Sequence, residues 1–396
     1  MEKIRSFNEK INIKNKTIIL RSDFNVPIKD DVIQDETRIN LSIPLIKNLL
    51  KREAKVLLIS HLGRPVDLKS KNFSLKPVFK YLNEKINNNM YFYSDKITNT
   101  TKEKISFLKR SEIIFFENVR LNEGEIKNDD NFAKNLSALG DIFINDAFSC
   151  AHRKQTSIHK ITKYIKNSYA GPLFMKEIHS ISMVLNNKKS PTTCIIGGSK
   201  ISTKLGVITT LIKRVDHLII VGAMANNFVK FKGNNVGKSL VEVGSEKIID
   251  EIYDKATKNK CEIMIPLDFA VSKSMDGKAN YKDPQNVEDD DIILDVGRRT
   301  IKKISEVIDN SKTVLWNGPA GYFENKNFSK GTISIAKKIS NNTNDSSLIS
   351  IVGGGDTISS IKNNELDVNF THLSTAGGAF LEYIEGKNLP GIEVLK

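Results

Sequence analysis

The chain has 396 residues, a hydrophobic content of 39% and a formal net charge of +14 at pH 7. A chain of this length exceeds what one hydrophobic core usually organises, so two domains are expected. No run of about 18 apolar residues occurs, and the first residues alternate charged with apolar side chains, so neither a membrane span nor a secretion signal is predicted. We therefore expect a cytoplasmic protein.

Short apolar runs rich in β-branched and aromatic residues recur at helix-length intervals, which is typical of buried parallel strands. The first series comprises residues 17–20, 55–60, 112–116 and 141–145. The second series comprises residues 193–196, 217–221, 262–265, 313–316 and 348–352. Between them, Pro172 suits the first turn of a connecting helix over residues 172–185. The pattern predicts an α/β protein with two doubly wound parallel-sheet (Rossmann-like) domains joined by a hinge helix.

Cysteine and lysine usage exclude several kinds of site. The three cysteines, Cys150, Cys194 and Cys261, are far apart and form no C-x-x-C pair, so neither a disulfide framework nor a zinc site is predicted. Of the 60 basic residues 49 are lysines, spread along the chain without a stripe of arginine and aromatic residues. This distribution argues against specific nucleic-acid recognition and favours attraction of small anionic ligands.

Arginine and glycine divide unequally between the two halves of the chain. Eight of the eleven arginines lie at or before Arg153, whereas twenty of the twenty-three glycines lie after it. The planar fork of arginine suits a small ligand with several anionic groups, and glycine-rich turns let backbone N–H groups approach a polyphosphate. The first half therefore predicts an acid-binding site and the second half a nucleotide-binding site.

In the first half, four successive strands run into segments that contain Arg or His. The carboxyl ends of parallel strands are where such sheets bind ligands. With an arginine from the segment D-E-T-R-I, a basic cluster is predicted from Arg38, His61, Arg64, Arg120 and Arg153. A single arginine of this kind is more often part of a surface ion pair, but so many at strand ends favour a site. Asp23 and Asn25 would accept hydrogen bonds from a hydroxyl group there.

In the second half, the strand that ends at Ile196 leads into G-G-S-K-I-S-T-K, which is expected to place Lys200 and Lys204 on one face of an opening helix. Both ammonium groups would then reach phosphate oxygens. A later strand leads into G-G-G-D-T, where Asp356 follows three glycines at the start of a helix. A single carboxylate suits a Mg²⁺ ion that bridges phosphates, and the alternative is that Asp356 only caps the helix.

Two nucleotide-binding motifs can be rejected. The segment Gly233–Ser239 resembles a P-loop, but three residues separate its glycines where four are required, and no convincing strand precedes it. No G-x-G-x-x-G occurs in the chain, so a dinucleotide-dependent dehydrogenase has no motif in its support.

Nine sequence blocks stand in order along nearly the whole chain: R-S-D-F-N-V-P, D-E-T-R-I, S-H-L-G-R-P, E-N-V-R, N-D-A-F-S-C-A-H-R, G-G-S-K-I-S-T-K, L-W-N-G-P-A-G-Y-F-E, G-G-G-D-T and S-T-A-G-G-A-F-L-E. This set resembles the phosphoglycerate kinase family. The resemblance implies reversible phosphoryl transfer between 1,3-bisphosphoglycerate and ADP, giving 3-phosphoglycerate and ATP, a step of glycolysis and gluconeogenesis. It also implies a monomer that uses Mg²⁺ as cofactor.

The resemblance further implies how the chain divides and which residues bind. The N-terminal, phosphoglycerate-binding domain would comprise residues 1–171 and a returning tail, 386–396, with the nucleotide-binding domain at 186–385. The phosphoglycerate ligands would be Asp23, Asn25, Arg38, His61, Arg64, Arg120 and Arg153. The nucleotide ligands would be Lys200, Lys204, Gly222, Gly297, Asn317, Glu324, Gly353, Gly354, Gly355, Asp356 and Thr357, with Asp356 on magnesium.

The reaction itself makes few chemical demands. Both possible nucleophiles, a carboxylate and a terminal phosphate, are ionised near pH 7, so no general base is needed. Catalysis must supply in-line positioning and charge neutralisation, which we assign to Arg38, Lys200, Mg²⁺ and the N–H groups of Gly354 and Gly355. Hinge closure that excludes water is expected as well.

Three positions depart from the family pattern. Ala223 stands where a glycine is usual, Arg298 where a proline is usual, and Ala376 where a glycine is usual. Two alternatives therefore remain open at this point. One is a ligand-binding relative that has lost turnover through these changes, and the other is a nucleic-acid-binding protein that uses the lysine-rich surface.

Overall fold

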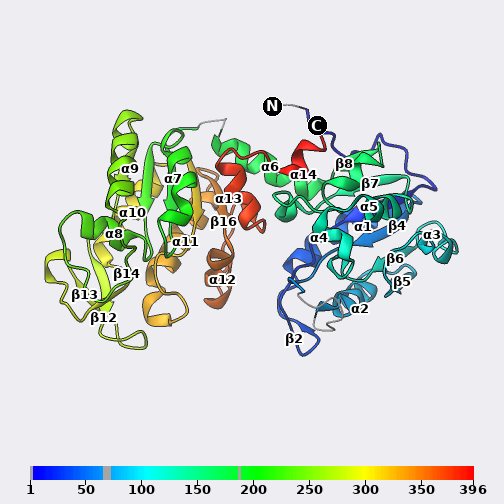
Figure 1. The fold of residues 1–396 in the computed structure, drawn as a ribbon. Helices are drawn as coiled ribbons and strands as arrows, with labels where there is room; N and C mark the ends of the chain where they lie inside the picture. The colour runs from blue at the N-terminus through cyan, green and yellow to red at the C-terminus, as the bar shows by residue number, and fades with distance from the viewer. Residues whose placement is uncertain (1–2, 66–72, 186–188) are drawn as a thin grey trace. The chain divides into compact units, whose positions relative to one another are not determined.

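The computed structural model describes residues 3–65, 73–185 and 189–396. The chain divides into two units, each built on its own six-stranded sheet (Figure 1). The first unit comprises Met1–Ile178 and Asn388–Lys396, and the second comprises His179–Lys387. None of the described helices combines the length and the apolar character that crossing a membrane requires.

The sheet of the first unit has the strand order β5-β6-β4-β1-β7-β8, and every neighbouring pair is parallel. Its strands are β1 (Thr17–Arg21), β4 (Lys55–Ile59), β5 (Met90–Tyr93), β6 (Ile113–Phe116), β7 (Ile142–Asn145) and β8 (Ser168–Ala170). Two short strands, β2 (Ile28–Lys29) and β3 (Val32–Ile33), form a separate hairpin. Along the chain the sheet grows first to one side of β1 and then to the other. A topological switch point therefore lies between β1 and β7.

Both faces of this sheet are buried. Alternate residues of one strand belong to different apolar clusters: Ile18 and Leu20 lie in one, and Ile19 lies in the other. The first cluster is covered by α1 (Thr37–Lys51) and α2 (Lys76–Lys85), and the second by α5 (Asp130–Ser137). Burial on both faces explains why the strands are continuous apolar runs. The remaining helical segments that belong wholly to this unit are α3 (Thr101–Lys104), η2 (Val119–Leu121), α4 (Glu123–Lys127), η3 (Phe148–Cys150), η4 (Lys160–Lys163) and α14 (Pro390–Glu393).

The second unit repeats this architecture with the strand order β11-β10-β9-β15-β16-β17, again parallel throughout. Its strands are β9 (Thr192–Ile196), β10 (His217–Ile220), β11 (Glu262–Met264), β15 (Thr313–Asn317), β16 (Ile349–Gly353) and β17 (His372–Ser374). Trp316 of β15 is fully buried in a cluster with side chains of α10, α11 and α12. The helical segments that lie wholly in this unit are η5 (Ser202–Lys204), α7 (Leu205–Ile212), α8 (Ala225–Phe231), α9 (Glu246–Lys258), η6 (Pro284–Asn286), α10 (Arg298–Asn310), η7 (Lys326–Phe328), α11 (Lys330–Asn344), α12 (Gly355–Asn363) and α13 (Gly378–Ile384).

The predicted fold class is confirmed, and all nine predicted strand segments are strands. The prediction did not include the edge strands β5, β8 and β17, or a three-stranded antiparallel sheet in the second unit. That sheet consists of β13 (Asn280–Lys282), β12 (Phe269–Ser272) and β14 (Ile292–Val296). The rejected P-loop segment, Gly233–Ser239, follows helix α8 and not a strand, so its rejection is consistent with the structure.

The chain leaves the first unit through α6 (Pro172–Leu185), which has the bounds predicted for the connecting helix. The chain comes back to the first unit at Asn388. There the N–H of Gly391 donates to the carbonyl of Ala151 at 2.8 Å, and the N–H of Arg5 donates to that of Leu395 at 2.7 Å. A Cβ on Gly391 would lie 2.9 Å from the Cα of Ala151, so glycine permits this close approach.

The second unit carries the single tryptophan of the sequence, which makes its stability measurable by itself. Ile339 of α11 is fully buried in the same cluster as Trp316, so replacing it by alanine should lower the free energy of unfolding by about 2–5 kcal/mol. Urea titration followed by Trp316 fluorescence measures this change. The control is Val243→Ala, since Val243 is 99% exposed, and a loss as large in the control would contradict the packing described.

Candidate functional site

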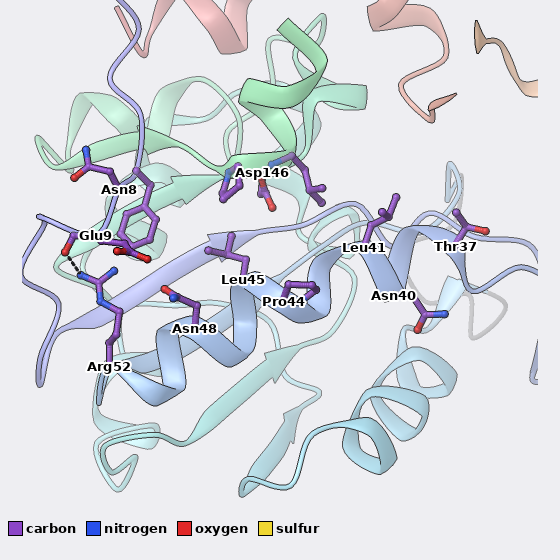
Figure 2. Close-up of a pocket in the computed structure, with 13 residues that line it drawn as sticks. Asn8, Glu9, Thr37, Asn40, Leu41, Pro44, Leu45, Asn48, Arg52 and Asp146 are labelled. Carbon is purple, nitrogen blue, oxygen red and sulfur yellow. Dashed lines mark hydrogen bonds between the residues drawn. The ribbon is translucent and has the colours of Figure 1, made fainter. Parts of the chain in front are cut away.

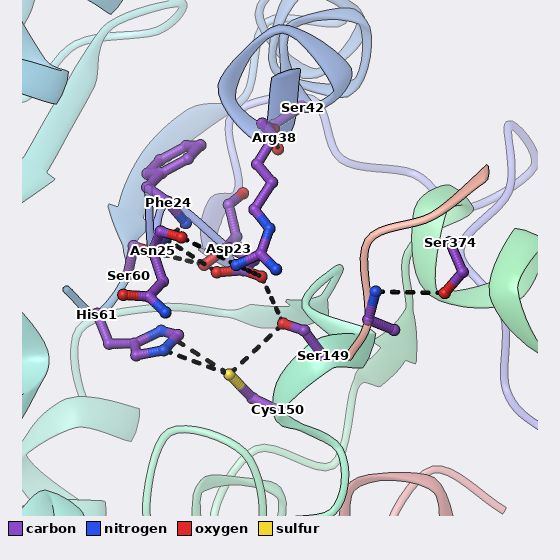
Figure 3. A network of polar contacts seen from close by, with 12 residues as sticks. Asp23, Phe24, Asn25, Arg38, Ser42, Ser60, His61, Ser149, Cys150 and Ser374 are labelled. Atoms are coloured by element: carbon purple, nitrogen blue, oxygen red, sulfur yellow. Dashed lines mark hydrogen bonds and ion pairs between the residues drawn. The ribbon is translucent and has the colours of Figure 1, made fainter. Parts of the chain in front are cut away.

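A cluster of polar side chains gathers where the strands of the first sheet end (Figure 3). Arg38, near the start of α1, places Nη1 3.0 Å from Oδ2 of Asp23, the second residue after β1. The same nitrogen donates to the backbone carbonyl of Asn25 at 2.9 Å. Asp23 Oδ2 also accepts a 2.5 Å hydrogen bond from Ser149. Asp23, Asn25 and Arg38, all predicted from the sequence, therefore lie together.

Arg120 joins this cluster through the turn that follows β4. Its Nη1 donates to the carbonyl of Gly63 at 2.6 Å, and the N–H of Gly63 donates to Oδ1 of Asn25 at 2.8 Å. Arg120 Nη2 donates to Gln155, which the sequence analysis did not include. Burial lowers the pKa of Arg120 to about 10, so the guanidinium remains charged near pH 7. Its Nε is buried without a hydrogen-bond partner among the described residues, a donor that an anion could satisfy.

Two buried charges beneath the cluster were missed. Arg21, the last residue of β1, is fully buried and donates to Ser157 at 3.0 Å, to the carbonyl of Ser22 at 2.5 Å and toward His61 at 3.2 Å. Glu125 is also fully buried and accepts two hydrogen bonds from Ser157, at 2.6 and 2.9 Å. Burial raises the pKa of Glu125, while Arg21 opposes that rise. The segment T-I-I-L-R did signal an arginine at the end of a buried strand, but no sequence pattern pointed to Glu125.

His61 lies buried against these cations and is a neutral side chain. Burial is the main cause that lowers its pKa well below the usual 6.5, and the charges of Arg21, Arg120, Arg38 and Arg153 lower it further. Because the guanidinium of Arg21 can only donate, Nδ1 of His61 must accept, which leaves the proton on Nε2. The side chain can therefore act as a hydrogen-bond donor without titrating.

The remaining members of the predicted cluster are placed less directly. Arg153 is close enough for its charge to lower the pKa of both His61 and Arg120. Arg64 is exposed and follows Gly63, and its part in the site stays a prediction. Cys150 lies 3.8 Å from both ring nitrogens of His61, and burial raises the pKa of its thiol, so it stays protonated. Four guanidinium groups share this region with the carboxylates of Asp23 and Glu125, so positive charge is in excess.

In the second unit, Lys204 lies at the switch point between β9 and β15. Its ammonium group donates to the carbonyl of Gly197, just after β9, and to Oδ1 of Asn317 at 2.8 Å, at the end of β15. Burial lowers the pKa of Lys204 to about 8, and the nearby carboxylate of Asp356 partly offsets this effect. Lys204 and Asn317 were both predicted, and the structure brings them into contact.

Asn317 connects Lys204 to the glycine-rich turn after β16. Its side-chain nitrogen donates to the carbonyl of Gly353 at 2.9 Å. The next residue, Gly354, has φ +103°, and a Cβ on it would lie 2.8 Å from that nitrogen, so only glycine fits without strain. Thr357 is fully buried in α12 and accepts a 2.7 Å hydrogen bond from the N–H of Gly318. The predicted residues 353–357 therefore form one cradle with Asn317.

Lys200 and Asp356 differ from the sequence prediction in their placement. The α-helix after β9 begins only at Leu205, and the exposed Lys200 lies in the loop before it, so the two lysines do not share one helical face. Ile201 ends the loop, and the 3₁₀ turn η5 then runs from Ser202 to Lys204 itself. Asp356 is exposed in the first turn of α12, whose N-cap is Gly354. Asp356 is therefore not the cap that the sequence left as the alternative.

A cavity of about 460 Å³ adjoins this cradle, and three of the residues predicted to bind a nucleotide, Gly222, Glu324 and Asp356, line it. Its apolar wall was missed because it comes from the antiparallel sheet, with Phe269 of β12 and Leu294 of β14. The apolar runs F-A-V-S and I-I-L-D-V were the sequence signal that could have indicated these two strands. An apolar slot beside a glycine-lined cradle suits a planar base attached to a polyphosphate.

The three positions that depart from the family pattern have local explanations. Ala223 lines the cavity. Arg298 stacks its guanidinium on Tyr281, 4.6 Å from the ring centroid, and Ala376 is buried with its N–H donating to Ser374.

Gly297 is not among the described residues that line the cavity, and a Cβ there would meet the carboxylate of Asp268 at 2.2 Å.

Arginine side chains cluster at the edge of one parallel sheet, and a lysine lies among glycine-rich turns at the edge of the other. These two features define the class of protein as a two-unit α/β kinase. The phosphoglycerate kinase family model matches residues 8–387. Phosphoglycerate kinase of Wolbachia sp. subsp. Drosophila simulans is 42% identical over 390 residues, covering 98% of each chain, and that of Finegoldia magna is 43% identical, covering 97% of each. The solved phosphoglycerate kinase of Coxiella burnetii superposes with a TM-score of 0.89 at 37% identity, covering 99% of each chain. The chain therefore belongs to the phosphoglycerate kinase family, whose members are kinases that act on small-molecule substrates.

The buried position of His61 predicts its behaviour in solution. Its imidazole signals should show no titration midpoint near pH 6.5 in NMR, because burial and neighbouring arginines hold the folded pKa well below this usual value. The unfolded chain takes up a proton near pH 6.5 that the folded chain does not, so the free energy of unfolding should fall as the pH drops below about 6.5. His61→Gln should remove this part of the pH dependence. A His61 midpoint near 6.5 would rule out the neutral assignment.

Proposed function

We propose that this chain catalyses the reversible transfer of a phosphoryl group between 1,3-bisphosphoglycerate and ADP, giving 3-phosphoglycerate and ATP. One observation carries the proposal: the two parallel sheets end in different sets of anion-binding groups. Guanidinium groups dominate the first, and glycine N–H groups with a lysine dominate the second. A pair of ligands, one a phosphorylated acid and one a nucleotide, is what such a combination suits.

The phosphoglycerate would bind at the basic cluster of the first unit. Arg38 and Arg120 present planar forks for the carboxylate and phosphate, with Arg64 and Arg153 as further cations. Asp23 and Asn25 would accept from the hydroxyl group, and His61 would donate from Nε2. The hydrogen bonds among Asp23, Asn25 and Gly63 hold these groups in place before a ligand arrives.

The nucleotide would bind in the second unit. Its base would occupy the cavity lined by Gly222 and Glu324, and its phosphates would lie against the cradle of Asn317, residues 353–357 and Lys204, with Lys200 reaching from the loop. Gly297 would shape the turn behind Asp268 rather than touch the nucleotide. Asp356 is exposed, lines the cavity and offers oxygen ligands, so it fits a Mg²⁺ ion that is otherwise held by phosphates and water. The ion would neutralise charge on the transferring group.

The transfer needs no general base, because both nucleophiles are already ionised near pH 7. The low pKa of His61 agrees with this, because an imidazole that stays neutral near pH 7 is only a weak base. Arg38, Lys200 and the N–H groups of Gly354 and Gly355 would stabilise the charge of the phosphoryl group in flight. With these roles assigned, the reaction would need no catalytic triad.

We infer the wider setting from the same proposal. The first unit would be the phosphoglycerate domain and the second the nucleotide domain, with α6 as the hinge whose closure stays a prediction. The protein would act as a cytoplasmic monomer in glycolysis and gluconeogenesis, without nucleic acid as a partner. The departures at Ala223, Arg298 and Ala376 leave the cradle and the basic cluster intact, so turnover is favoured over binding alone.

An assay with ATP and 3-phosphoglycerate, coupled to NADH oxidation, tests the proposed reaction. Arg38→Ala should lower turnover at least a hundredfold, on the order of 3 kcal/mol in transition-state stabilisation, and leave ATP affinity nearly unchanged. Arg38→Lys keeps the charge without the fork and should not restore the rate. Arg110→Ala removes an exposed arginine of the same unit and serves as the control. Wild-type binding of both ligands without exchange would instead identify a relative that has lost turnover.

Nucleotide binding should also change the protonation of Lys204. A polyphosphate favours the charged ammonium and raises its pKa from about 8, so ATP binding near pH 8.5 should take up protons. Isothermal titration calorimetry in two buffers with different ionisation enthalpies measures this uptake. Lys204→Met should abolish it, whereas Lys200→Met, at an exposed lysine, should weaken binding but retain the uptake. Equal uptake in wild type and Lys204→Met would contradict the placement of Lys204 beside the phosphates.

A further inference from the structure

A second cavity, of about 780 Å³, lies in the first unit between α1, the N-terminal segment and the start of α6 (Figure 2). None of the seven residues predicted to bind phosphoglycerate is among the described residues that line it. Its walls are largely apolar and come from Phe7, Leu41, Pro44, Leu45 and Leu173. Leu41 is 41% exposed, which is unusual for a leucine, and it lies at the open side of the cavity.

Asp146 is the buried polar group of this cavity. It follows β7 and is only 4% exposed. Its Oδ1 accepts hydrogen bonds from the N–H groups of Leu173 and Phe174, at 2.7 and 3.1 Å, in the first turn of α6. Its Oδ2 is buried without any hydrogen-bond partner among the described residues. In Figure 2, Asp146 lies across the cavity from the face of α1 that carries Leu41, Pro44 and Leu45.

The part of the chain that the structure describes provides no counter-charge for this carboxylate. No ion pair of Asp146 occurs in the described part of the chain, and burial raises its pKa to about 7, opposed only by the two backbone N–H groups. A buried carboxylate is stable in the ionised state when it is paired and hydrogen-bonded.

Thr37, Asn8, Asn40 and Asn48 also line the cavity and can either donate or accept hydrogen bonds, so the preference for a cation depends on the carboxylates. Glu9 is exposed at the rim, and Pro44 lacks the N–H that would bond to the carbonyl of Asn40 within α1. Arg52 is the one lining residue with a positive charge among those described, and its Nη2 already donates to the carbonyls of Glu9 and Ile11. Its guanidinium also lies 5.5 Å from the centroid of the Phe7 ring.

We propose that this cavity is a binding site for a small organic cation whose apolar body is a ring. The ammonium group of the cation would pair with Oδ2 of Asp146, and the ring would pack against Phe7, Leu45 and Leu173. The cation would supply both the missing hydrogen bond and the missing charge, and the apolar walls would cover the rest of the molecule. An anionic ligand would instead pair with Nη1 of Arg52, which has no hydrogen-bond partner among the described residues, and the test includes that outcome. The site does not depend on the proposed kinase reaction.

Binding of 2-phenylethylamine at pH 8, followed by isothermal titration calorimetry, tests the proposal. The neutral isostere 2-phenylethanol should bind at least tenfold more weakly, because it cannot pair with the carboxylate. Asp146→Asn should weaken amine binding at least tenfold, since asparagine keeps an acceptor for Leu173 and Phe174 but loses the charge. Leu41→Lys, which adds a cation at the rim, should weaken the amine as well. Ile126→Lys makes the same kind of change at an exposed residue outside the cavity and should leave binding unchanged.

Circular dichroism shows whether each variant folds, and if Asp146→Asn does not, Leu41→Lys and the alcohol decide. The proposal is overturned if amine and alcohol bind equally, if folded Asp146→Asn keeps full affinity, or if no amine binds at millimolar concentration. Stronger binding of 3-phenylpropionate than of the amine would assign the cavity to anions through Arg52 and would likewise refute it.

Discussion

Both candidate sites depend on one constraint, the parallel in-register pairing of the central strands. Arg21 at the end of β1 pairs with Ile59 and Asn145, so the residues that follow these strands emerge side by side. In the second unit, Asn317 at the end of β15 pairs with Ile196 and Gly353 in the same way. Segments far apart in the sequence are thus brought together at the edge of the sheet where the strands end. Polar side chains and glycine turns meet at this edge because the paired strands end at the same register.

The edge of the first sheet brings charged groups into the protein interior. Arg21 and Glu125 are both fully buried, and Ser157 bonds to each of them. A buried charge is tolerated only when hydrogen bonds surround it, so this network fixes the positions of its members. His61 is oriented and kept neutral by the same network. The half-buried Arg38 and the buried Arg120 therefore lie against a hydrogen-bonded network that exists before any ligand binds.

Sequence patterns reveal the central strands and the residues after them, because burial on both faces leaves a continuous apolar run that ends abruptly in polar or glycine residues. Short edge strands such as β17 lack such a run, and the antiparallel sheet of β12 and β14 interrupts the alternation of strand and helix. Glu125 was missed because its partner Ser157 is 32 residues away, a contact that no local pattern encodes. The loop placement of Lys200 was missed because four-residue spacing fits a helix, whereas the chain first makes the 3₁₀ turn η5. Local signals thus predict elements, and tertiary contacts decide how side chains use them.

The path of the chain between the units has a consequence for biosynthesis. The second unit is one uninterrupted stretch, His179–Lys387, whereas the first needs both the residues before it and the tail Asn388–Lys396. A ribosome makes the chain from its N-terminus, so the second unit can complete its contacts before the tail of the first unit has emerged. The bonds from Gly391 to Ala151 and from Arg5 to Leu395 are the last to become available. The nascent first unit therefore remains incomplete until the segment Asn388–Lys396 has been made.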